Sequence, residues 1–267
     1  MIKEDLFELS LPYDGKRSKT VRVFVPAHEE GESLPVIYMT DGQNLFEDDR
    51  PLQYGCWYTR EALRGKRQKS GKTAIIVGIH NDEGPMERGL ELTPGSMGTI
   101  RYPEEIPEEI IKTMVPKGED FDRFVIDTVM PEIEKGFPVK TGRENTAFCG
   151  SSLGGIMSYY SVLTHPDRFC MGGVFSPAFP MFVLNDVINW TKSNVRDNAP
   201  FLFIYSGSGD KMEQDICKIT EAFYDSVSKF YPKDKLTKRI LPERPHHESA
   251  WAEAFKEFLS FFFSESA

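Results

Sequence analysis

The sequence lacks the patterns that would indicate a disulfide scaffold or a metal centre. Only four of its 267 residues are cysteines, and no two form a Cys-x-x-Cys pair. Scattered cysteines predict free buried thiols in a reducing compartment. The run His246-His247-Glu248 has no partner cluster of ligating residues elsewhere, so no metal site is predicted. The four cysteines are Cys56, Cys149, Cys170 and Cys217.

Long apolar runs and an excess of positive charge are also missing. No apolar run approaches the roughly 20 residues that span a bilayer. The N-terminus lacks the apolar stretch of a secretory signal, which predicts a cytoplasmic protein, or a secreted one if a signal has been removed. The formal net charge of −9 opposes association with nucleic acid or anionic membranes, so neither partner is expected. The basic run GKRQKSGK (65–72) is interpreted as a solvated loop.

What the sequence does contain is an alternation of short apolar runs with segments of helical periodicity. Continuously apolar strands separated by helices predict one α/β domain over residues 1–267, with a mostly parallel sheet covered on both faces. Ligands bind such sheets beyond the carboxyl ends of the strands. The expected strands are 20–26, 35–42, 73–79, 146–150, 172–177, 201–207 and 236–242, and the expected helices are 119–135, with Pro131 as a kink or restart, 212–230 and 248–263.

The stretch Gly150-Ser151-Ser152-Leu153-Gly154 follows one of these strands and precedes a helical pattern. A serine at a very tight strand-to-helix turn needs glycines two residues before and after it, because side chains there would collide. Ser152 has that frame and Ser151 does not, so Ser152 is the candidate nucleophile. The alternative is a Gly/Ser turn in which either serine caps the helix.

An acid and a base follow in later loops. Asp210 stands just past the strand 201–207 on a glycine-rich loop, and Glu213 is the alternative acid. The loop after the last strand supplies His246 and His247, either of which could be the base. A developing oxyanion needs two converging backbone N–H donors. The candidates are Leu153, directly after the nucleophile, and Gln43, in the loop that ends the strand 35–42.

Together these segments resemble the putative-esterase branch of the α/β-hydrolases. That branch contains carbohydrate esterase family 1 feruloyl and acetylxylan esterases, enterochelin-type siderophore esterases, S-formylglutathione hydrolase and the antigen 85 mycolyltransferases. The resemblance implies an α/β-hydrolase fold without a large separate lid domain. The matching stretches are VIYMTDGQNLF (36–46), CWYTREAL (56–63), IIVGIHN (75–81), FVIDTVMPEIEKGFPV (124–139), FCGSSLGGIMSYYSVLTHPDRF (148–169), VFSPAF (174–179), YSGSGDKM (205–212) and HHESAW (246–251).

The resemblance also assigns roles. It implies Ser152 as nucleophile, Asp210 as acid, and Gln43 and Leu153 as oxyanion donors. The family histidine usually stands five residues before a tryptophan, which selects His246, although His247 replaces the small or polar residue usual at its position.

The resulting expectation is a serine carboxylester hydrolase that needs no cofactor and acts on feruloyl or acetyl esters of plant polysaccharide or on similar small esters. The alternatives are a siderophore esterase, an S-acylglutathione thioesterase, an acyltransferase and a non-catalytic binding protein of the same fold.

Two irregular segments are expected to shape the substrate pocket. The segment 81–120 is too long for a plain connector, and it carries Arg88 and Glu91 as candidate polar contacts, with surface salt bridges as the alternative. The segment 178–190 offers Phe179, Phe182 and Trp190 as exposed aromatic side chains that could line an acyl or aryl pocket, with simple packing over the sheet as the alternative.

Overall fold

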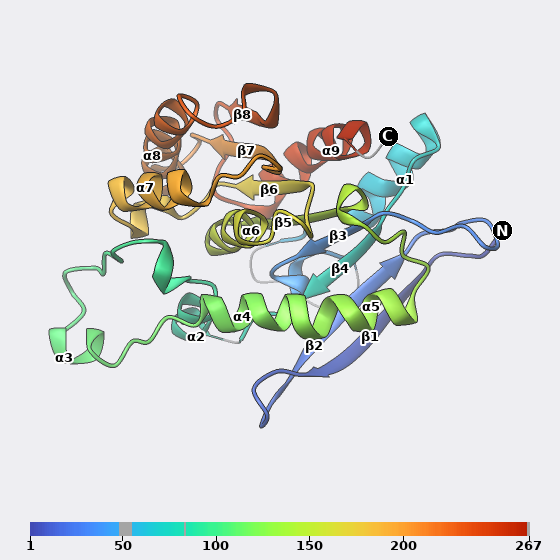
Figure 1. Cartoon of the computed structure of the whole chain (residues 1–267), viewed down its shortest axis with the longest axis horizontal. Coiled ribbons are helices and arrows are strands. Elements are labelled where there is room, and N and C mark those ends of the chain that lie inside the picture. Colours follow the sequence, from blue (N-terminus) through green and yellow to red (C-terminus); the bar gives the residue numbers. More distant parts are fainter. Residues whose placement is uncertain (48–54, 83, 266–267) are drawn as a thin grey trace.

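One 8-stranded sheet, in the order β1-β2-β4-β3-β5-β6-β7-β8, organises the computed structural model, which describes residues 1–47, 55–82 and 84–265 (Figure 1). β2 pairs antiparallel with β1 and with β4, and all other neighbouring strands are parallel. The carboxyl ends of β3 to β8 therefore share one edge. The strands are β1 (Asp5–Pro12), β2 (Ser18–Val25), β3 (Val36–Met39), β4 (Ile75–Ile79), β5 (Thr146–Ser151), β6 (Met171–Phe175), β7 (Phe201–Gly207) and β8 (Leu236–Leu241).

The seven strands expected from apolar runs are all present, and β1 is the additional strand. The central strands β3 to β7 are buried along their whole length, as parallel strands covered on both faces should be. β1 lies at the sheet edge and only Leu11 of it is buried. Its mixed polar and apolar residues therefore give no continuous apolar run.

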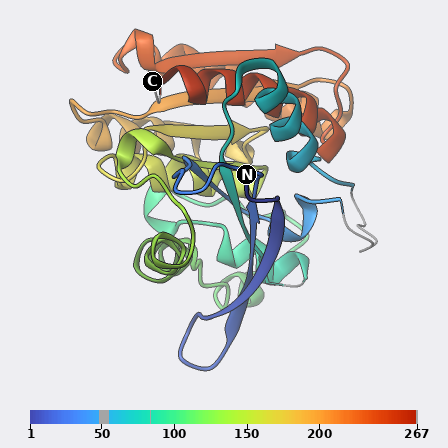
Figure 2. The ribbon, with the colours of Figure 1, turned by 90° about the vertical axis from the view of Figure 1, so that its right-hand side faces the viewer.

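Helices cover both faces of the sheet, as predicted (Figure 2). The apolar residues of α4, α5, α6, α7 and α8 pack into one buried cluster, and those of α1 and α9 pack into a second cluster on the opposite face. The helices are α1 (Thr59–Ser70), α2 (Pro85–Glu91), α3 (Glu108–Ile111), α4 (Gly118–Phe124), α5 (Met130–Gly136), α6 (Leu153–Thr164), α7 (Leu184–Asn194), α8 (Lys211–Val227) and α9 (Glu248–Glu265).

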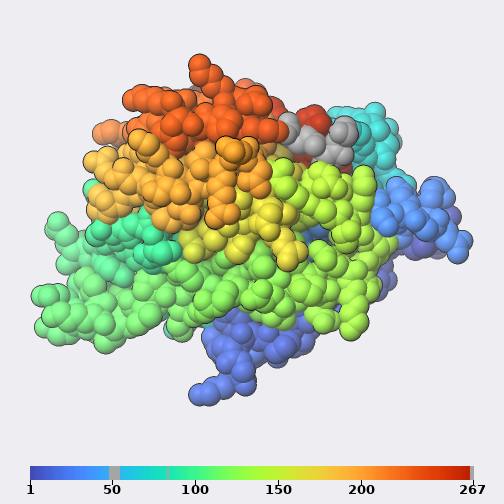
Figure 3. Space-filling model, viewed as in Figure 1, coloured from blue at the N-terminus to red at the C-terminus, as the bar shows by residue number. Residues whose placement is uncertain are grey.

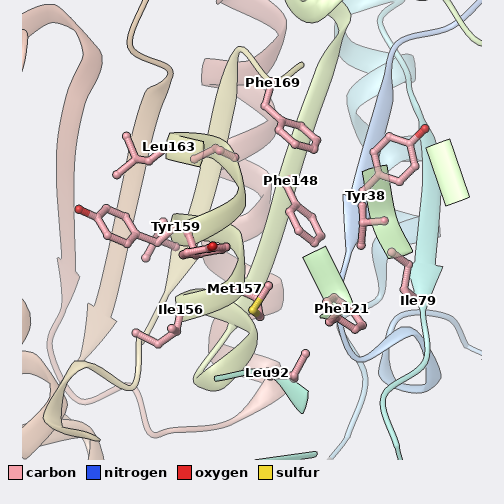
Figure 4. Packing of buried hydrophobic residues seen from close by; sticks show 14 of the residues in the cluster. Tyr38, Ile79, Leu92, Phe121, Phe148, Ile156, Met157, Tyr159, Leu163 and Phe169 are labelled. Carbon is pink, nitrogen blue, oxygen red and sulfur yellow. The ribbon is translucent and has the colours of Figure 1, made fainter. Parts of the chain in front are cut away.

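α6, which follows the candidate nucleophile, is the central helix of the first cluster (Figure 4). It is buried from Leu153 to Leu163. Tyr159 packs edge-on against Phe179 and Phe223, with ring centroids 5.6 and 5.4 Å away. Beneath the helix, Phe148 of β5 stacks on Phe169. This packing fixes the helix that carries the turn at Ser152.

The predicted helix 119–135 is part of a continuous helical run from α4 to α5. Between them, Val125–Val129 is wound as a π-helix. α5 begins at Met130, one residue before Pro131, which has no backbone N–H to donate to the preceding turn. The wide π-helical turn accommodates the hydrogen bond that Pro131 cannot make, so the chain stays helical through the proline.

Two predicted loops contain helices. The basic run 65–72 is not a solvated loop, because its first six residues are the end of α1 and Gly71 terminates the helix with φ 72°. Its Lys, Arg and Gln residues have good helix propensity, which explains the difference. The segment 81–120 contains α2, α3 and the start of α4, while its residue 83 lies outside the described residues. Figure 3 shows the green surface around α3 projecting at one end of the molecule.

No helix among the described residues is both long enough and apolar enough to cross a lipid bilayer.

Candidate active site

Ser152 is the single residue between β5, which ends at Ser151, and α6, which begins at Leu153. Its φ of 57° and ψ of −119° place it in a strained conformation for a residue with a side chain. The turn is held because Ser152 N–H donates to the carbonyl of Phe175 (2.9 Å) and Ser152 C=O accepts from Ala178 N–H (3.1 Å). The predicted tight turn with Ser152 at its apex is therefore present.

The glycines around Ser152 are required by close contacts. A Cβ added to Gly150 would lie 2.4 Å from the carbonyl oxygen of Gly154, and one added to Gly154 would lie 2.0 Å from Thr40 Oγ1. Real Cβ atoms do not approach other atoms so closely, so only glycine fits at either position. Ser151 is buried and belongs to the strand, which leaves Ser152 as the serine at the turn.

His246 comes from the loop between β8 and α9, and its ring is held on two sides. Nδ1 lies 2.6 Å from Oε2 of Glu213. The ring also packs edge-on against Trp251, with a centroid distance of 5.0 Å. Because a carboxylate only accepts hydrogen bonds, Nδ1 carries the proton and Nε2 keeps its lone pair. The ring is thus prepared to accept a proton at Nε2.

Glu213 is completely buried in the first turn of α8, and four groups bind its carboxylate. Oε2 accepts from His246, while Oε1 accepts from Ser176 Oγ (2.6 Å), Ser206 Oγ (2.9 Å) and Gly207 N–H (2.6 Å). Burial would raise the pKa of Glu213, but the hydrogen bonds from His246, Ser176 and Gly207 outweigh burial and hold the pKa below its ordinary value. Glu213 therefore stays ionised at neutral pH.

The Asp210 carboxylate does not reach the imidazole ring, which corrects the expectation that it orients the base. Oδ1 accepts from Glu213 N–H and Oδ2 accepts from His246 N–H, both at 2.8 Å. Asp210 is thus the N-cap of α8, and it also binds the backbone of His246. A sequence signal for this was available, because Asp-x-x-Glu at positions 210–213 is the spacing of a helix N-cap followed by a first-turn carboxylate.

The loop after β7 and the loop after β8, which carries His246, contact each other through glycines. Ser208 and Gly209 N–H both donate to the carbonyl of Arg244. A Cβ on Gly207 would lie 2.1 Å from that same carbonyl oxygen. His247 points elsewhere: its Nδ1 lies 2.9 Å from Ser249 Oγ. Among the contacts of the described residues, His246 is bound to a buried carboxylate and His247 is not.

Gln43 lies in the turn η1 (Gly42–Asn44) beyond β3, at the same sheet edge as Leu153. The predicted close approach at Gly42 is present, since an added Cβ would lie 2.4 Å from the carbonyl carbon of Gly78. Within residues 1–47, 55–82 and 84–265, the backbone N–H groups of Gln43 and Leu153 donate to no other group. Both predicted donors therefore remain available to a ligand.

Four of the residues expected to shape the pocket have partners elsewhere in the protein. Phe179 is fully buried in the core, as is Phe182, so neither is the exposed aromatic that was expected. Trp190 is partly buried and stacks on Tyr160 with a centroid distance of 5.4 Å. Arg88 binds the Asp41 carboxylate through two hydrogen bonds, of 2.6 and 2.9 Å. The partners of these side chains are distant in the sequence, so the sequence alone could not identify them.

The sequence did not predict the burial of two further carboxyl groups, those of Glu91 and Glu248. Glu91 is 1% exposed and pairs with Lys19 Nζ at 2.6 Å, so it is not a surface contact. Glu248, at the start of α9, is 4% exposed, and its Oε1 accepts from Asn44 Nδ2 at 3.2 Å. Burial, reinforced by the negative charge of Asp41, raises the pKa of Glu248 to about 7. Glu248 links the loop of Gln43 to the loop of His246.

Comparison with known proteins places this geometry in a family. The model of the family described as "Putative esterase" matches residues 15–262. A curated relative, the endo-1,4-beta-xylanase/feruloyl esterase of Xylanibacter ruminicola, is 28% identical over 94 residues, which are 35% of this chain and 12% of the relative. A second, the uncharacterized protein YbbA of Bacillus subtilis, is 20% identical over 256 residues, which are 94% of each chain.

Solved structures confirm the α/β-hydrolase fold. The BES protein from Bacillus cereus superposes with a TM-score of 0.71 at 19% identity, covering 98% of this chain and 96% of that one. The enterobactin esterase FES from Shigella flexneri gives a TM-score of 0.69 at 18% identity, and the match covers 98% of this chain and 60% of that longer chain. The CE1 ferulic acid esterase from Anaeromyces mucronatus gives 0.65 at 18% identity, covering 99% and 92%.

The buried carboxyl of Glu248 predicts a pH dependence of stability. The folded state keeps this proton up to a pH of about 7, whereas an unfolded glutamate loses it near 4.5. The contribution of Glu248 is therefore fully present at acidic pH and is lost between these values. Between pH 5 and pH 8, the free energy of unfolding of the wild type should fall by about 1–2 kcal/mol more than that of Glu248→Gln, measured by urea denaturation.

Glu253→Gln is the matched control, because Glu253 lies on the same helix but forms an exposed ion pair with Arg244. It should keep the wild-type pH slope. Equal slopes for wild type and Glu248→Gln would contradict the assignment.

Proposed function

This chain belongs to the Putative esterase family and is a carboxylic ester hydrolase, and on that premise we propose that it cleaves esters through Ser152, His246 and Glu213. The observation that carries the proposal is the hydrogen bond of 2.6 Å between His246 Nδ1 and the fully buried carboxylate of Glu213. A buried, ionised carboxylate on one ring nitrogen makes the other nitrogen a base. Ser152, at the strained turn of the same sheet edge, is the group that this base would activate.

In the proposed acylation step, Ser152 Oγ attacks the carbonyl carbon of the ester while His246 Nε2 takes the hydroxyl proton. The carbonyl oxygen becomes an oxyanion and accepts hydrogen bonds from the backbone N–H groups of Gln43 and Leu153. Each such donor contributes about 3 kcal/mol to lowering the barrier. The C–O bond to the alcohol then breaks, and the alcohol leaves with the proton from the imidazolium. Glu213 stabilises that imidazolium without taking its proton.

Deacylation repeats these events with water. His246 Nε2 removes a proton from the water molecule, whose oxygen attacks the acyl carbon bound to Ser152 Oγ. Collapse of the second tetrahedral intermediate returns the proton to Ser152 and releases the carboxylic acid. The same two N–H donors serve both steps, so no cofactor enters the proposed cycle.

We propose feruloyl or acetyl esters of plant polysaccharide, or similar small esters, as the substrate class. Support comes from the similarity to a feruloyl esterase in sequence and to ferulic acid esterases in structure. A siderophore ester is the second candidate, favoured by the similarity to enterobactin esterase structures and to a siderophore hydrolase from Aspergillus nidulans. An S-acylglutathione thioester and transfer of the acyl group to an alcohol other than water remain further alternatives on the same fold.

One prediction of the proposed mechanism concerns the nucleophile. Ser152→Ala should lower kcat by at least about 10⁴-fold, because the acyl-enzyme can no longer form. The measurement is release of acid from p-nitrophenyl, feruloyl, acetylxylan and siderophore esters, with Ser151→Ala as the neighbouring control. Equal activity of wild type and Ser152→Ala would refute the serine mechanism. The ester with the highest kcat/KM would identify the substrate class.

A second prediction separates the two histidines. His246→Ala should abolish turnover, since it removes the imidazole ring that is hydrogen-bonded to the buried carboxylate of Glu213. His247→Ala should keep kcat within about threefold, because His247 contacts Ser249 rather than Glu213. Steady-state kinetics on the best ester of the panel decides the matter. An inactive His247→Ala together with an active His246→Ala would overturn the assignment.

A third prediction separates the two acids. Glu213→Gln keeps the shape but removes the charge beside His246, so kcat should fall by about 10³–10⁴-fold. Asp210→Asn should cost about tenfold or less, because asparagine caps helices nearly as well as aspartate. Thermal unfolding of both variants provides the control for folding. If Asp210→Asn were the more damaged in kcat, Asp210 would be the acid after all.

A further inference from the structure

The turn that presents Gln43 depends on Asp41, whose backbone is in the left-handed region with φ 53° and ψ 45°. Asn44 N–H donates to the carbonyl of Asp41 at 2.8 Å and closes the turn, while Gly42 lies directly against Gly78. A residue with a side chain adopts this conformation at a cost, so surrounding contacts must maintain it. The direction of the Gln43 N–H follows from how Asp41 is held.

The Asp41 side chain is held by hydrogen bonds from several segments. Arg88 Nε donates to Oδ1 at 2.6 Å and Arg88 Nη2 donates to Oδ2 at 2.9 Å. Asn81 Nδ2 also donates to Oδ1, and Thr40 Oγ1 donates to Oδ2 at 3.3 Å. Asp41 is 6% exposed. A bidentate pair of this kind fixes the orientation of a carboxylate.

Arg88 is itself rigidly placed. It lies on α2, which is anchored by the buried pair of Glu91 and Lys19. Glu91 also accepts from Asp82 N–H at 2.7 Å. Burial lowers the pKa of Arg88, but the Asp41 carboxylate more than offsets this and raises it, so the guanidinium stays charged. The long segment after β4 therefore places the charged guanidinium of Arg88 beside the Gln43 turn.

The charge of Asp41 would oppose the reaction if it were unpaired. An oxyanion that forms near the Gln43 N–H would be repelled by a carboxylate two residues away in the chain, and water is scarce at a buried site to screen it. Pairing with Arg88 cancels that charge. The pair can therefore serve both the geometry and the electrostatics of the same turn.

We propose that Arg88 and Asp41 are positioning residues that fix the Gln43 N–H for the oxyanion, and that Arg88 is not a substrate-binding residue. The inference rests on the proposed serine mechanism, and it names a residue pair that, among the described residues, forms no hydrogen bond with Ser152 or His246. It assigns the segment 81–91 a role in the chemical step rather than in substrate selection.

The test is the kinetics of Arg88→Ala. If the pair positions the oxyanion donor, kcat should fall about 10²–10³-fold with KM changed less than about threefold. Affinity for a phenylboronic acid, which forms a tetrahedral adduct with an active serine, should fall by a similar factor. Added guanidinium chloride at low millimolar concentration should restore part of kcat. Arg239→Ala is the matched control, since Arg239 forms an exposed pair with Glu257 at 2.9 Å.

A double-mutant cycle separates a coupled pair from two independent defects. Arg88→Ala combined with Asp41→Asn should lose no more kcat than the worse single variant, because the two residues act as a unit. If Arg88→Ala does not fold, Arg88→Lys replaces it: lysine keeps the charge but loses the bidentate geometry, and kcat should still fall about tenfold.

Three outcomes would overturn the proposal. The first is a raised KM with unchanged kcat, which would make Arg88 a substrate contact. The second is an unchanged kcat in Arg88→Ala or Arg88→Lys while Ser152→Ala is inactive. The third is full additivity in the double-mutant cycle. An active Ser152→Ala would instead refute the serine mechanism itself, so the two failures are distinguishable.

Discussion

A single buried negative charge, the carboxylate of Glu213, determines how the surrounding loops are arranged. A charge that is completely removed from water is stable only when hydrogen-bond donors replace the water. The donors come from the ends of β6, β7 and β8, through Ser176, Ser206, Gly207 and His246. Satisfying this one group therefore aligns three separate loops at the sheet edge. Trp251 extends the network by donating to Ser176 at 2.9 Å.

A second buried carboxylate, Asp41, occupies the other side of the Ser152 turn, and it is neutralised in a different way. Among the described residues, no lysine or arginine pairs with Glu213, whose carboxylate is bound by neutral donors and by the His246 imidazole. Asp41 has a permanent cation, Arg88, supplied by α2. The contrast fits the two proposed tasks: the carboxylate proposed to act on a proton is held by neutral donors and an imidazole, and the carboxylate that only holds a turn is paired with an arginine. Glu248 lies between the two networks and takes its proton from solvent near neutral pH.

The sequence was sufficient to predict the strands and the tight turn at Ser152 but not the pairings between distant residues. Apolar runs located every strand except β1, and the glycines around Ser152 identified the tight turn, because these features depend on neighbours in the chain. The carboxylate that binds the His246 ring was harder to predict. Asp210 and Glu213 both follow β7, and the choice between them depends on where α8 begins. The helix starts at Lys211, which makes Asp210 a cap and turns Glu213 toward the base.

Other residues were misjudged for the same reason. Arg88 and Glu91 are charged, which favours a position at the surface. Each instead pairs with a buried residue more than 40 positions away in the chain. Phe179 lies in an irregular segment after a strand. Its side chain is buried because α6 and α8 pack over the same face of the sheet and contact it. Burial of this kind is a property of the assembled layers and leaves no local periodicity.

The position of Glu213 one turn into α8 has a consequence for how heat affects the molecule. Helix ends open locally at a much smaller free-energy cost than the whole domain unfolds. Opening the first turn of α8 would release the Asp210 cap, and with it both the Glu213 carboxylate and the backbone of His246. The proposed acid and base would then separate while the sheet remained folded. Hydrogen exchange at Glu213 N–H would report this local opening separately from the melting of the domain.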